Sequence, residues 1–229
     1  MTARYALYAA PPPDSRLWPF GSSVIGYDAA TASDLAFPKH PPCDSSDWAA
    51  MTEDPRRYGF HGTLKAPFAL AAGCPEGELL EAAMLFAERR SAFVVPALEV
   101  ALLGRFVALV PAAPSPALGA LAADCVREFD RFRAPLTEAD RARRLKSPLT
   151  PRQIDHLDAW GYPYVFEDFR FHMTLTGALP ESRRAEVRAA LDAAYREVSE
   201  PLRLDALCIY RQADRSSRFT ILARFPFDG

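Results

Sequence analysis

Apolar side chains recur in two patterns along the chain, and these patterns divide it into regular elements. Short apolar or alternating segments bounded by Gly and Pro are typical of β-strands. Apolar residues that recur every three or four positions are typical of helices with one buried face. The predicted strands are residues 4–10, 60–70, 93–103, 105–110, 168–179, 202–211 and 219–225, and the predicted helices are 76–90, 116–133, 150–161 and 181–199.

Capping residues mark the ends of two helices in the second half. Thr137 and Asp140 have the spacing of a capping box ahead of a short basic helix. Thr150 precedes Pro151, which suits an N-cap followed by a proline at the first helical position. Gly161 is a suitable residue to end that helix, because glycine adopts the left-handed conformation without strain.

The order strand, helix, strand, strand occurs twice along the chain. It predicts an α+β fold with two pseudo-symmetric lobes, each an antiparallel sheet covered by helices, and a central cleft. We expect residues 1–229 to form a single two-lobed domain with an internal duplication. The Pro-rich segment 11–54 lacks a clear period, so it predicts loops with one or two short helices, anchored by Trp18 and Phe20.

Composition narrows the class of protein. Hydrophobic residues make up 49% of the chain, enough for a real core, and the net charge of -2 argues against long nucleic acid as a partner. No apolar run approaches a membrane span, and the first residues are too polar for a signal peptide. The four cysteines form no C-x-x-C pair, which predicts free thiols and a cytoplasmic location. For an interlocked two-lobed fold of this size the default expectation is a monomer.

A His-x-Thr pattern occurs once in each half. It reads His61-Gly62-Thr63 and His172-Met173-Thr174, with Phe before and Leu after each motif. The histidines are 172 − 61 = 111 residues apart, close to half the chain. One such tripeptide is a trivial match, but two in equivalent predicted strands are hard to obtain by accident.

Strand geometry explains why this spacing is useful. Side chains alternate between the two faces of a strand, so residues two apart share a face. The predicted polar faces hold His61, Thr63, Lys65, Arg170, His172, Thr174 and Thr176. Two such strands related by a pseudo-two-fold axis would present two imidazoles and two hydroxyls to one small ligand.

The paired motifs resemble those of the two-histidine phosphoesterase superfamily, which includes RNA ligase-like 2′,5′ enzymes and cyclic phosphodiesterases. The flanking residues 57–65, 160–164 and 169–176 are similar to the phosphonate-operon-associated branch, found near carbon–phosphorus lyase genes. The resemblance covers essentially the whole chain. It implies that His61 and His172 are the catalytic pair and that Thr63 and Thr174 hold the phosphate. One departure is Gly62, where a small side chain such as Ala is common.

The resemblance implies metal-independent hydrolysis of a small cyclic phosphate or phosphodiester, without a cofactor. Histidine suits both acid and base roles near neutral pH, and the sequence leaves open which histidine takes which. Lys65 and Arg170 are the candidate substrate-binding cations. The expected partner is a small nucleotide or sugar cyclic phosphate. A ribosyl cyclic phosphate of phosphonate metabolism and a 2′,3′- or 1″,2″-cyclic nucleotide or RNA end both stay open.

Other interpretations compete with this one. The chain could be a nucleotide- or RNA-end-binding module without activity, or an RNA 2′,3′-cyclic phosphodiesterase. A metallophosphoesterase is disfavoured, because the histidines form no H-x-x-H or H-x-D pattern. For His40 and His156 we expect no catalytic role.

Several side chains near the motifs have plain structural interpretations. Lys65 could be a solvated strand residue, and Arg170 could pair with Asp168 or Glu167. Buried packing explains a group of three tyrosines better than a ligand does: Tyr58, Tyr164 and Tyr210. A solvated helix face likewise explains the basic cluster of Arg141, Arg143, Arg144 and Lys146.

Overall fold

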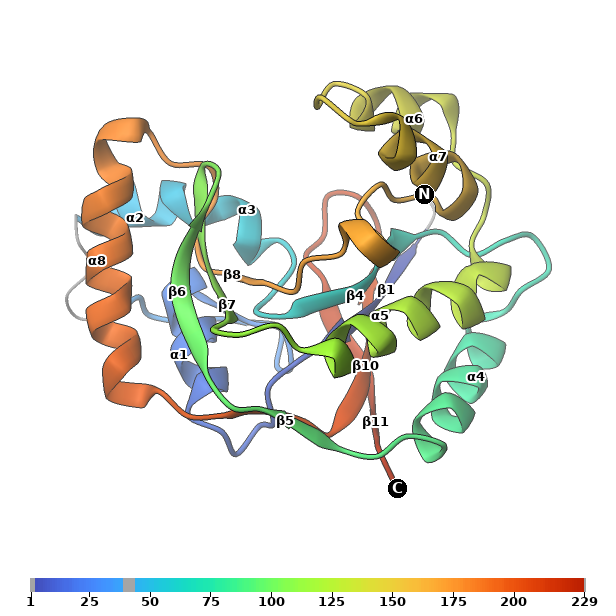
Figure 1. Ribbon diagram of the computed structural model, residues 1–229, viewed down its shortest axis with the longest axis horizontal. Helices are drawn as coiled ribbons and strands as arrows, with labels where there is room; N and C mark the ends of the chain where they lie inside the picture. Colours follow the sequence, from blue (N-terminus) through green and yellow to red (C-terminus); the bar gives the residue numbers. More distant parts are fainter. Residues whose placement is uncertain (1–2, 39–43, 229) are drawn as a thin grey trace.

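Seven antiparallel strands form the central sheet of the computed structural model, which describes residues 3–38 and 44–228. Their order is β11-β10-β1-β4-β8-β7-β6 (Figure 1). These strands are β1 (Arg4–Ala9), β4 (Gly62–Phe68), β6 (Leu98–Leu103), β7 (Phe106–Pro111), β8 (Met173–Thr174), β10 (Ala206–Gln212) and β11 (Thr220–Pro226). Two small pairs lie apart from it, β2 (Tyr27–Asp28) with β3 (Ser33–Asp34) and β5 (Phe93–Val95) with β9 (Leu202–Leu204).

The helices follow the sequence patterns closely in the second half of the chain. They are α1 (Leu17–Ile25), α2 (Ser45–Met51), α3 (Glu53–Arg56), α4 (Glu76–Glu88), α5 (Pro116–Phe129), α6 (Glu138–Arg144), α7 (Pro151–Trp160) and α8 (Glu181–Val198), with 3-10 turns η1 (Asp130–Phe132) and η2 (Phe166–Asp168). The predicted capping box of α7 is present at Thr150 and Gln153, and Gly161 ends the helix with a φ of 74°. Thr137 caps α6 by accepting from the Asp140 amide.

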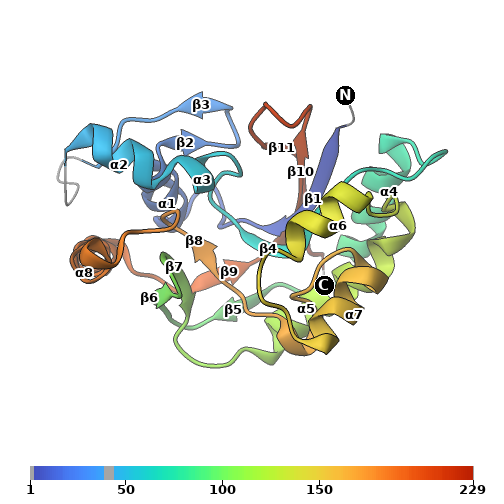
Figure 2. The same cartoon turned by 90° about the horizontal axis from the view of Figure 1, so that it is seen from above.

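The helix of each repeat packs on the strand hairpin of the other repeat. The first repeat supplies β4, α4, β6 and β7, and the second supplies β8, α8, β10 and β11. Helix α8 packs on the β6–β7 hairpin, whereas α4 packs on β10 and β11 (Figures 1 and 2). Each helix thus buries the apolar face of the other repeat's hairpin. The predicted antiparallel α+β fold is confirmed, with the two halves joined in one sheet.

Two antiparallel contacts join equivalent places in the repeats. In the sheet, Gly62 of β4 faces Met173 of β8. In the small pair, Val94 of β5 faces Arg203 of β9. An antiparallel pairing of equivalent segments is what a two-fold axis between them produces, so both contacts support the proposed internal duplication.

The strand expected over residues 168–179 is wrong for most of its length. Regular pairing covers Met173 and Thr174, and residues 166–168 form η2 instead. The hydroxyl of Thr176 accepts the Val107 amide at 3.0 Å, while the amides of Leu175 and Thr176 both donate to the Val107 carbonyl. The side chain therefore replaces a main-chain partner and ends the ladder.

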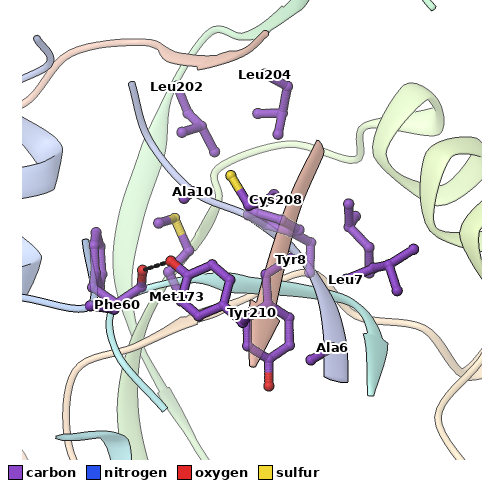
Figure 3. Packing of buried hydrophobic residues seen from close by; sticks show 14 of the residues in the cluster. Ala6, Leu7, Tyr8, Ala10, Phe60, Met173, Leu202, Leu204, Cys208 and Tyr210 are labelled. Carbon is purple, nitrogen blue, oxygen red and sulfur yellow. Dashed lines mark hydrogen bonds between the residues drawn. The ribbon is translucent and has the colours of Figure 1, made fainter. Parts of the chain in front are cut away.

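A core of aromatic and aliphatic side chains lies beneath the sheet junction. In Figure 3, Leu7 and Tyr8 of β1 pack near Cys208 and Tyr210 of β10, and Met173 lies beside them. Cys74, Cys125 and Cys208 are free thiols, and Cys43 lies outside the described residues. Among the described helices, none combines the length and apolar character that crossing a membrane requires.

The Pro-rich segment 11–54 contains more regular structure than its sequence predicted. It holds α1, β2, β3, α2 and the start of α3, and its residues 39–43, including His40, lie outside the described part of the chain. Trp18 is buried as expected, and Phe20 is partly buried. The deepest anchor is Trp48, which is 0% exposed and donates its indole N–H to the Val24 carbonyl at 2.9 Å.

Trp48 should therefore stabilise the docking of α2 on α1. We expect Trp48→Ala to lower the free energy of unfolding by about 3–5 kcal/mol, because it removes a large buried side chain. Trp48→Phe keeps most of the apolar volume but leaves the Val24 carbonyl unpaired, which costs about 1–3 kcal/mol. Denaturant titration followed by circular dichroism measures both changes. A Trp48→Ala loss below 1 kcal/mol would contradict this packing.

Candidate functional site

The two His-x-Thr motifs show the same alternation of burial. The histidine and threonine side chains are half-buried, whereas the residues before, between and after them are buried. The half-buried residues are His61, Thr63, His172 and Thr174, and the buried ones are Phe60, Gly62, Leu64, Phe171, Met173 and Leu175. Both motifs therefore turn their apolar side chains to the core and their polar side chains to the other face.

One strand pairing brings the motifs together. Because Gly62 faces Met173 in an antiparallel register, His61 comes opposite Thr174 and Thr63 comes opposite His172. Side chains directly opposite each other have Cβ atoms about 5 Å apart. The two imidazoles and two hydroxyls predicted to face one ligand thus stand on one face of adjacent strands.

Main-chain carbonyls orient both imidazoles in the same way. Nδ1 of His61 lies 2.8 Å from the carbonyl oxygen of Gly59, and Nδ1 of His172 lies 2.8 Å from that of Arg170. A carbonyl oxygen only accepts, so each Nδ1 carries the proton and each neutral ring keeps a lone pair on Nε2. Nε2 of His61 lies 3.2 Å from the Thr63 hydroxyl oxygen.

Gly59 is required by this geometry. Its φ is 78°, in the left-handed region, and a Cβ there would lie 2.6 Å from the Cβ of Ala29. This conformation allows the Gly59 carbonyl to reach back to the imidazole two residues later. In the second motif Arg170 provides the equivalent carbonyl with ordinary backbone geometry.

Burial keeps both imidazoles neutral. It lowers the pKa of His61 to about 4, against the opposing effect of the Gly59 carbonyl, and the charge of His172 lowers it further. Burial also lowers the pKa of His172, again opposed by a main-chain carbonyl. Tyr8 covers the His61 ring almost parallel, with ring centres 3.6 Å apart and planes 14° apart. Phe106 lies near the His172 ring, at 5.7 Å between centres.

A cavity of about 760 Å³ opens beside the motifs. Thr63 and His172 line it, while His61 and Thr174 are not among its lining residues. Its other walls come from α5, α7, the β6–β7 turn and residues 162–170. The cavity is large enough for a small phosphorylated ligand.

The placement of Lys65 corrects the predicted polar face. Tyr8 pairs with Thr63, but the next partner along β1, Leu7, pairs with Lys65, so the register skips Leu64. This bulge puts Lys65 on the face opposite to Thr63. Lys65 is 4% exposed, and its ammonium bonds Asp130 at 3.0 Å and the Val126 carbonyl at 3.2 Å. Its contacts are those of a structural ion pair with the first residue of η1 and a bond to α5, and it is absent from the lining of the large cavity.

Arg170 lies where the sequence placed it, at the cavity. It is exposed and lines the cavity, and among the described residues no hydrogen bond or ion pair involves its guanidinium. The alternative pairing with Asp168 is wrong, because both oxygens of that carboxylate bond Arg152, at 2.9 and 3.0 Å. Gln153 adds a third bond, so α7 holds the segment that leads into the second motif.

The tyrosines near the site divide into two groups. Tyr210 is buried as expected, and its hydroxyl donates to the Phe60 carbonyl at 3.4 Å. Tyr164 is 40% exposed and lines the cavity together with Tyr162, so the packing expected for Tyr164 is wrong. Tyr8 was missed, because a tyrosine in a buried strand gives no signal that it stacks on a histidine far along the chain.

Gly62 is explained by the packing of the second motif. A Cβ at this position would lie 2.4 Å from the Phe171 ring. We expect Gly62→Ala to push Phe171 aside, separate β4 from β8 and destabilise the fold by about 1–3 kcal/mol. Thermal unfolding measures the loss, and Gly77→Ala, with nothing within 4 Å of the added Cβ, is the matched control. Equal stability of both variants would contradict this account.

The lowered pKa of His61 links stability to pH. Its value is about 6.5 in an unfolded chain and about 4 in the fold, so between these values the unfolded state binds more protons. The free energy of unfolding should therefore fall as pH falls through this window, by up to about 1.4 kcal/mol per pH unit from this group. His61→Gln should show a shallower slope in denaturant titrations between pH 4 and 6.5. Identical slopes would contradict the burial of a neutral imidazole.

Comparison with known proteins gives a family. Residues 63–220, more than half of the chain, match the family described as "Protein of unknown function (DUF1045)". The match spans Thr63, His172 and Thr174 and begins just after His61.

Two curated relatives carry the same name. "Ribose 1,5-bisphosphate phosphokinase PhnN" of Janthinobacterium sp. (strain Marseille) is 39% identical over 231 residues, covering 99% of this chain and 51% of that protein. The protein of that name from Laribacter hongkongensis (strain HLHK9) is 38% identical over 182 residues, covering 78% of this chain and 41% of that protein. The chain thus spans about half the length of the curated relatives it matches. These names agree with the phosphonate-operon association predicted from the motifs.

Solved structures resemble the chain more distantly. E. coli LigT complexed with 3′-AMP has a TM-score of 0.48 at 15% identity, and a structure titled "phosphoesterase" has a TM-score of 0.45 at 14% identity, each with both chains fully covered. At these scores the likeness carries no argument, and the two-histidine resemblance rests on the motifs. The family match over more than half of the chain establishes that the chain belongs to the DUF1045 family.

Proposed function

We propose that the chain is a phosphoesterase of the two-histidine type that hydrolyses a small cyclic phosphate or phosphodiester without a metal. The observation that carries this proposal is the pairing of Gly62 with Met173, which sets the two motifs against each other. Both Nδ1 atoms are bound by main-chain carbonyls, so the Nε2 atoms are left for proton transfer, that of His61 beside the Thr63 hydroxyl. Two imidazoles, one as base and one as acid, suffice for phosphoester hydrolysis.

In the proposed reaction water attacks phosphorus and passes its proton to Nε2 of one histidine. The bond from phosphorus to the leaving oxygen breaks, and that oxygen takes the proton from Nε2 of the second histidine. This second histidine is an imidazolium at the start of the reaction. The pKa of His61, lowered to about 4, keeps its lone pair free at neutral pH and suits it to the base role. The acid role then falls to His172, and an anionic phosphate beside it raises the pKa of its imidazole and so favours the imidazolium form.

Charge that develops on the phosphoryl oxygens needs fixed donors. In the proposed site, Thr63 and Thr174 supply hydroxyl groups from the same face as the imidazoles. Arg170, which has no partner among the described residues, supplies a guanidinium at the cavity. Such donors act strongly in a partly buried site, because little water competes with them.

The relatives' name supports a sugar phosphate as substrate. They are about twice as long as this chain and are named for a kinase that acts on ribose 1,5-bisphosphate. This chain has no Gly-Lys dipeptide, which an ATP-binding P-loop requires, so the named kinase activity fits the remainder of those proteins. Opening a ribosyl 1,2-cyclic phosphate that carries a 5-phosphate can yield ribose 1,5-bisphosphate, the kinase substrate. The expected cytoplasmic location fits this scheme and stays a prediction.

Hydrolysis of a panel of cyclic phosphates tests the proposal. The panel holds 5-phosphoribosyl 1,2-cyclic phosphate and 2′,3′-cyclic nucleotides, each assayed with a chelator present. We expect turnover of the first compound and a fall in kcat of about 10²–10⁴-fold in His61→Ala and in His172→Ala, the usual contribution of an acid–base group. His156→Ala, outside both motifs, is the control and should retain activity.

The competing outcomes are distinct. Preference for 2′,3′-cyclic nucleotides would assign the chain to RNA-end chemistry. Tight binding without turnover in folded wild-type protein would favour a binding module. Turnover that disappears with the chelator, or that survives in both histidine variants, would contradict the two-histidine mechanism.

A further inference from the structure

One arginine of α6 lies near the site without an acidic partner. Arg141 bonds Asp158 and Arg143 bonds Asp140. Arg144 instead places its guanidinium carbon 4.7 Å from the centre of the Tyr162 ring, and no carboxylate of the described residues pairs with it. Tyr162 lines the large cavity, so α6 holds an uncompensated positive charge over the cavity wall. The solvated helix face predicted for these residues therefore does not describe Arg144.

Three tyrosine rings gather around the same place. Tyr8 covers His61, the Tyr58 ring centre lies 6.4 Å from that of His61, and Tyr162 lines the cavity. Among the described residues, none of these three hydroxyls has a hydrogen-bond partner. The Tyr8 side chain is only 1% exposed, and its hydroxyl points away from the aliphatic core residues Leu202 and Leu204 (Figure 3). Its hydroxyl oxygen is not fully enclosed by protein, so it is open to a ligand.

Arg4 adds a second cation beside these tyrosines. It shares a face of β1 with Tyr8, because the two are four residues apart in one strand. Its guanidinium lies over the Phe219 ring at 5.5 Å, and Phe219 stacks on Tyr58 at 5.4 Å. It bonds the neutral amide of Gln212 and pairs with no carboxylate of the described residues.

The electrostatics of this place favour an anion. Burial lowers the pKa of Arg4, and the positive charges of Arg215 and Arg143 lower it further. Burial also raises the pKa of Tyr8 well above its usual value, while Arg4 and Arg144 oppose the rise. Asp140 is shared by Arg143 and Arg215, so it offsets only part of this charge.

We infer that Arg4 and Arg144, with the hydroxyls of Tyr8, Tyr58 and Tyr162, form a second anion subsite for a phosphate monoester carried by the substrate. Guanidinium groups present planar pairs of donors that match phosphate oxygens, and tyrosine hydroxyls complete the shell. The subsite lies beside His61, on which Tyr8 stacks, and it shares Tyr162 with the cavity that Arg170 lines. It deepens the proposed function, on which it rests, by selecting a small sugar that bears a separate phosphate group.

Binding of stable sugar phosphates tests the subsite without turnover. Isothermal titration would compare ribose 1-phosphate with ribose 1,5-bisphosphate on the wild-type protein. We expect the bisphosphate to bind about 10–100-fold more tightly, since one charged hydrogen-bonding group contributes that range of affinity. Arg144→Met keeps the side-chain stem over Tyr162 and should remove most of this advantage. Tyr8→Phe keeps the ring over His61 and should reduce it less.

A charge-matched control and a test that each variant is folded make the result specific. Arg188→Met, on exposed α8, removes the same charge without touching the cavity and should bind both ligands as the wild type does. Circular dichroism confirms that each variant is folded. Equal affinity of the two ligands for the wild type, or an unchanged advantage in Arg144→Met, would overturn the subsite.

The outcome separates this inference from the proposed function. Turnover of the cyclic phosphate with no bisphosphate advantage would retain the phosphoesterase and overturn the subsite. An Arg144-dependent advantage without any turnover would retain the subsite and overturn the phosphoesterase. A 3′-phosphorylated trinucleotide that binds more tightly than the bisphosphate, with the same Arg144 dependence, would overturn the sugar assignment.

Discussion

The antiparallel pairing of Gly62 with Met173 is the contact on which the rest of the structure depends. It joins β4 to β8 and so makes one sheet of two halves. The same contact sets the two His-x-Thr motifs side by side in opposite directions. Absence of a side chain at Gly62 allows Phe171 to pack across this junction. Fold and site therefore both depend on this one contact.

Around this junction the protein combines buried rings with free hydrogen-bonding atoms. Main-chain carbonyls fix the Nδ1 proton of each imidazole, and burial disfavours a second proton. The neutral histidines are thus prepared to accept a proton at Nε2, and the one that acts as the acid must first gain a proton there. Proton transfer falls to these rings, while Arg170 at the cavity and Arg144 over Tyr162 supply positive charge. This division separates proton transfer from anion binding.

Much of the fold follows from local patterns in the sequence. The helices α4, α5, α7 and α8 were predicted because periodicity and capping residues act within a few positions. The motif pair was predicted because alternation in a strand is also local. The face of Lys65 was not, because a bulge arises from the register with a distant strand. The contacts of Tyr8, Trp48 and Arg144 were not predicted for the same reason. Each partner lies outside the local sequence pattern, and the contact of Arg144 also depends on how α6 packs near α7.

Each repeat's helix packs on the strands of the other repeat, and this arrangement has a consequence for how the chain folds. Strand β1 lies between β4 and β10, so its pairing is complete only when β10, about 200 residues later in the sequence, has joined it. Contacts this distant slow folding, because a long loop must close before they can form. During synthesis on the ribosome, the edge of β1 that β10 covers stays open until residues near 212 have emerged. Such an open strand edge is prone to aggregation, which makes this stage the one at which a chaperone would protect the chain.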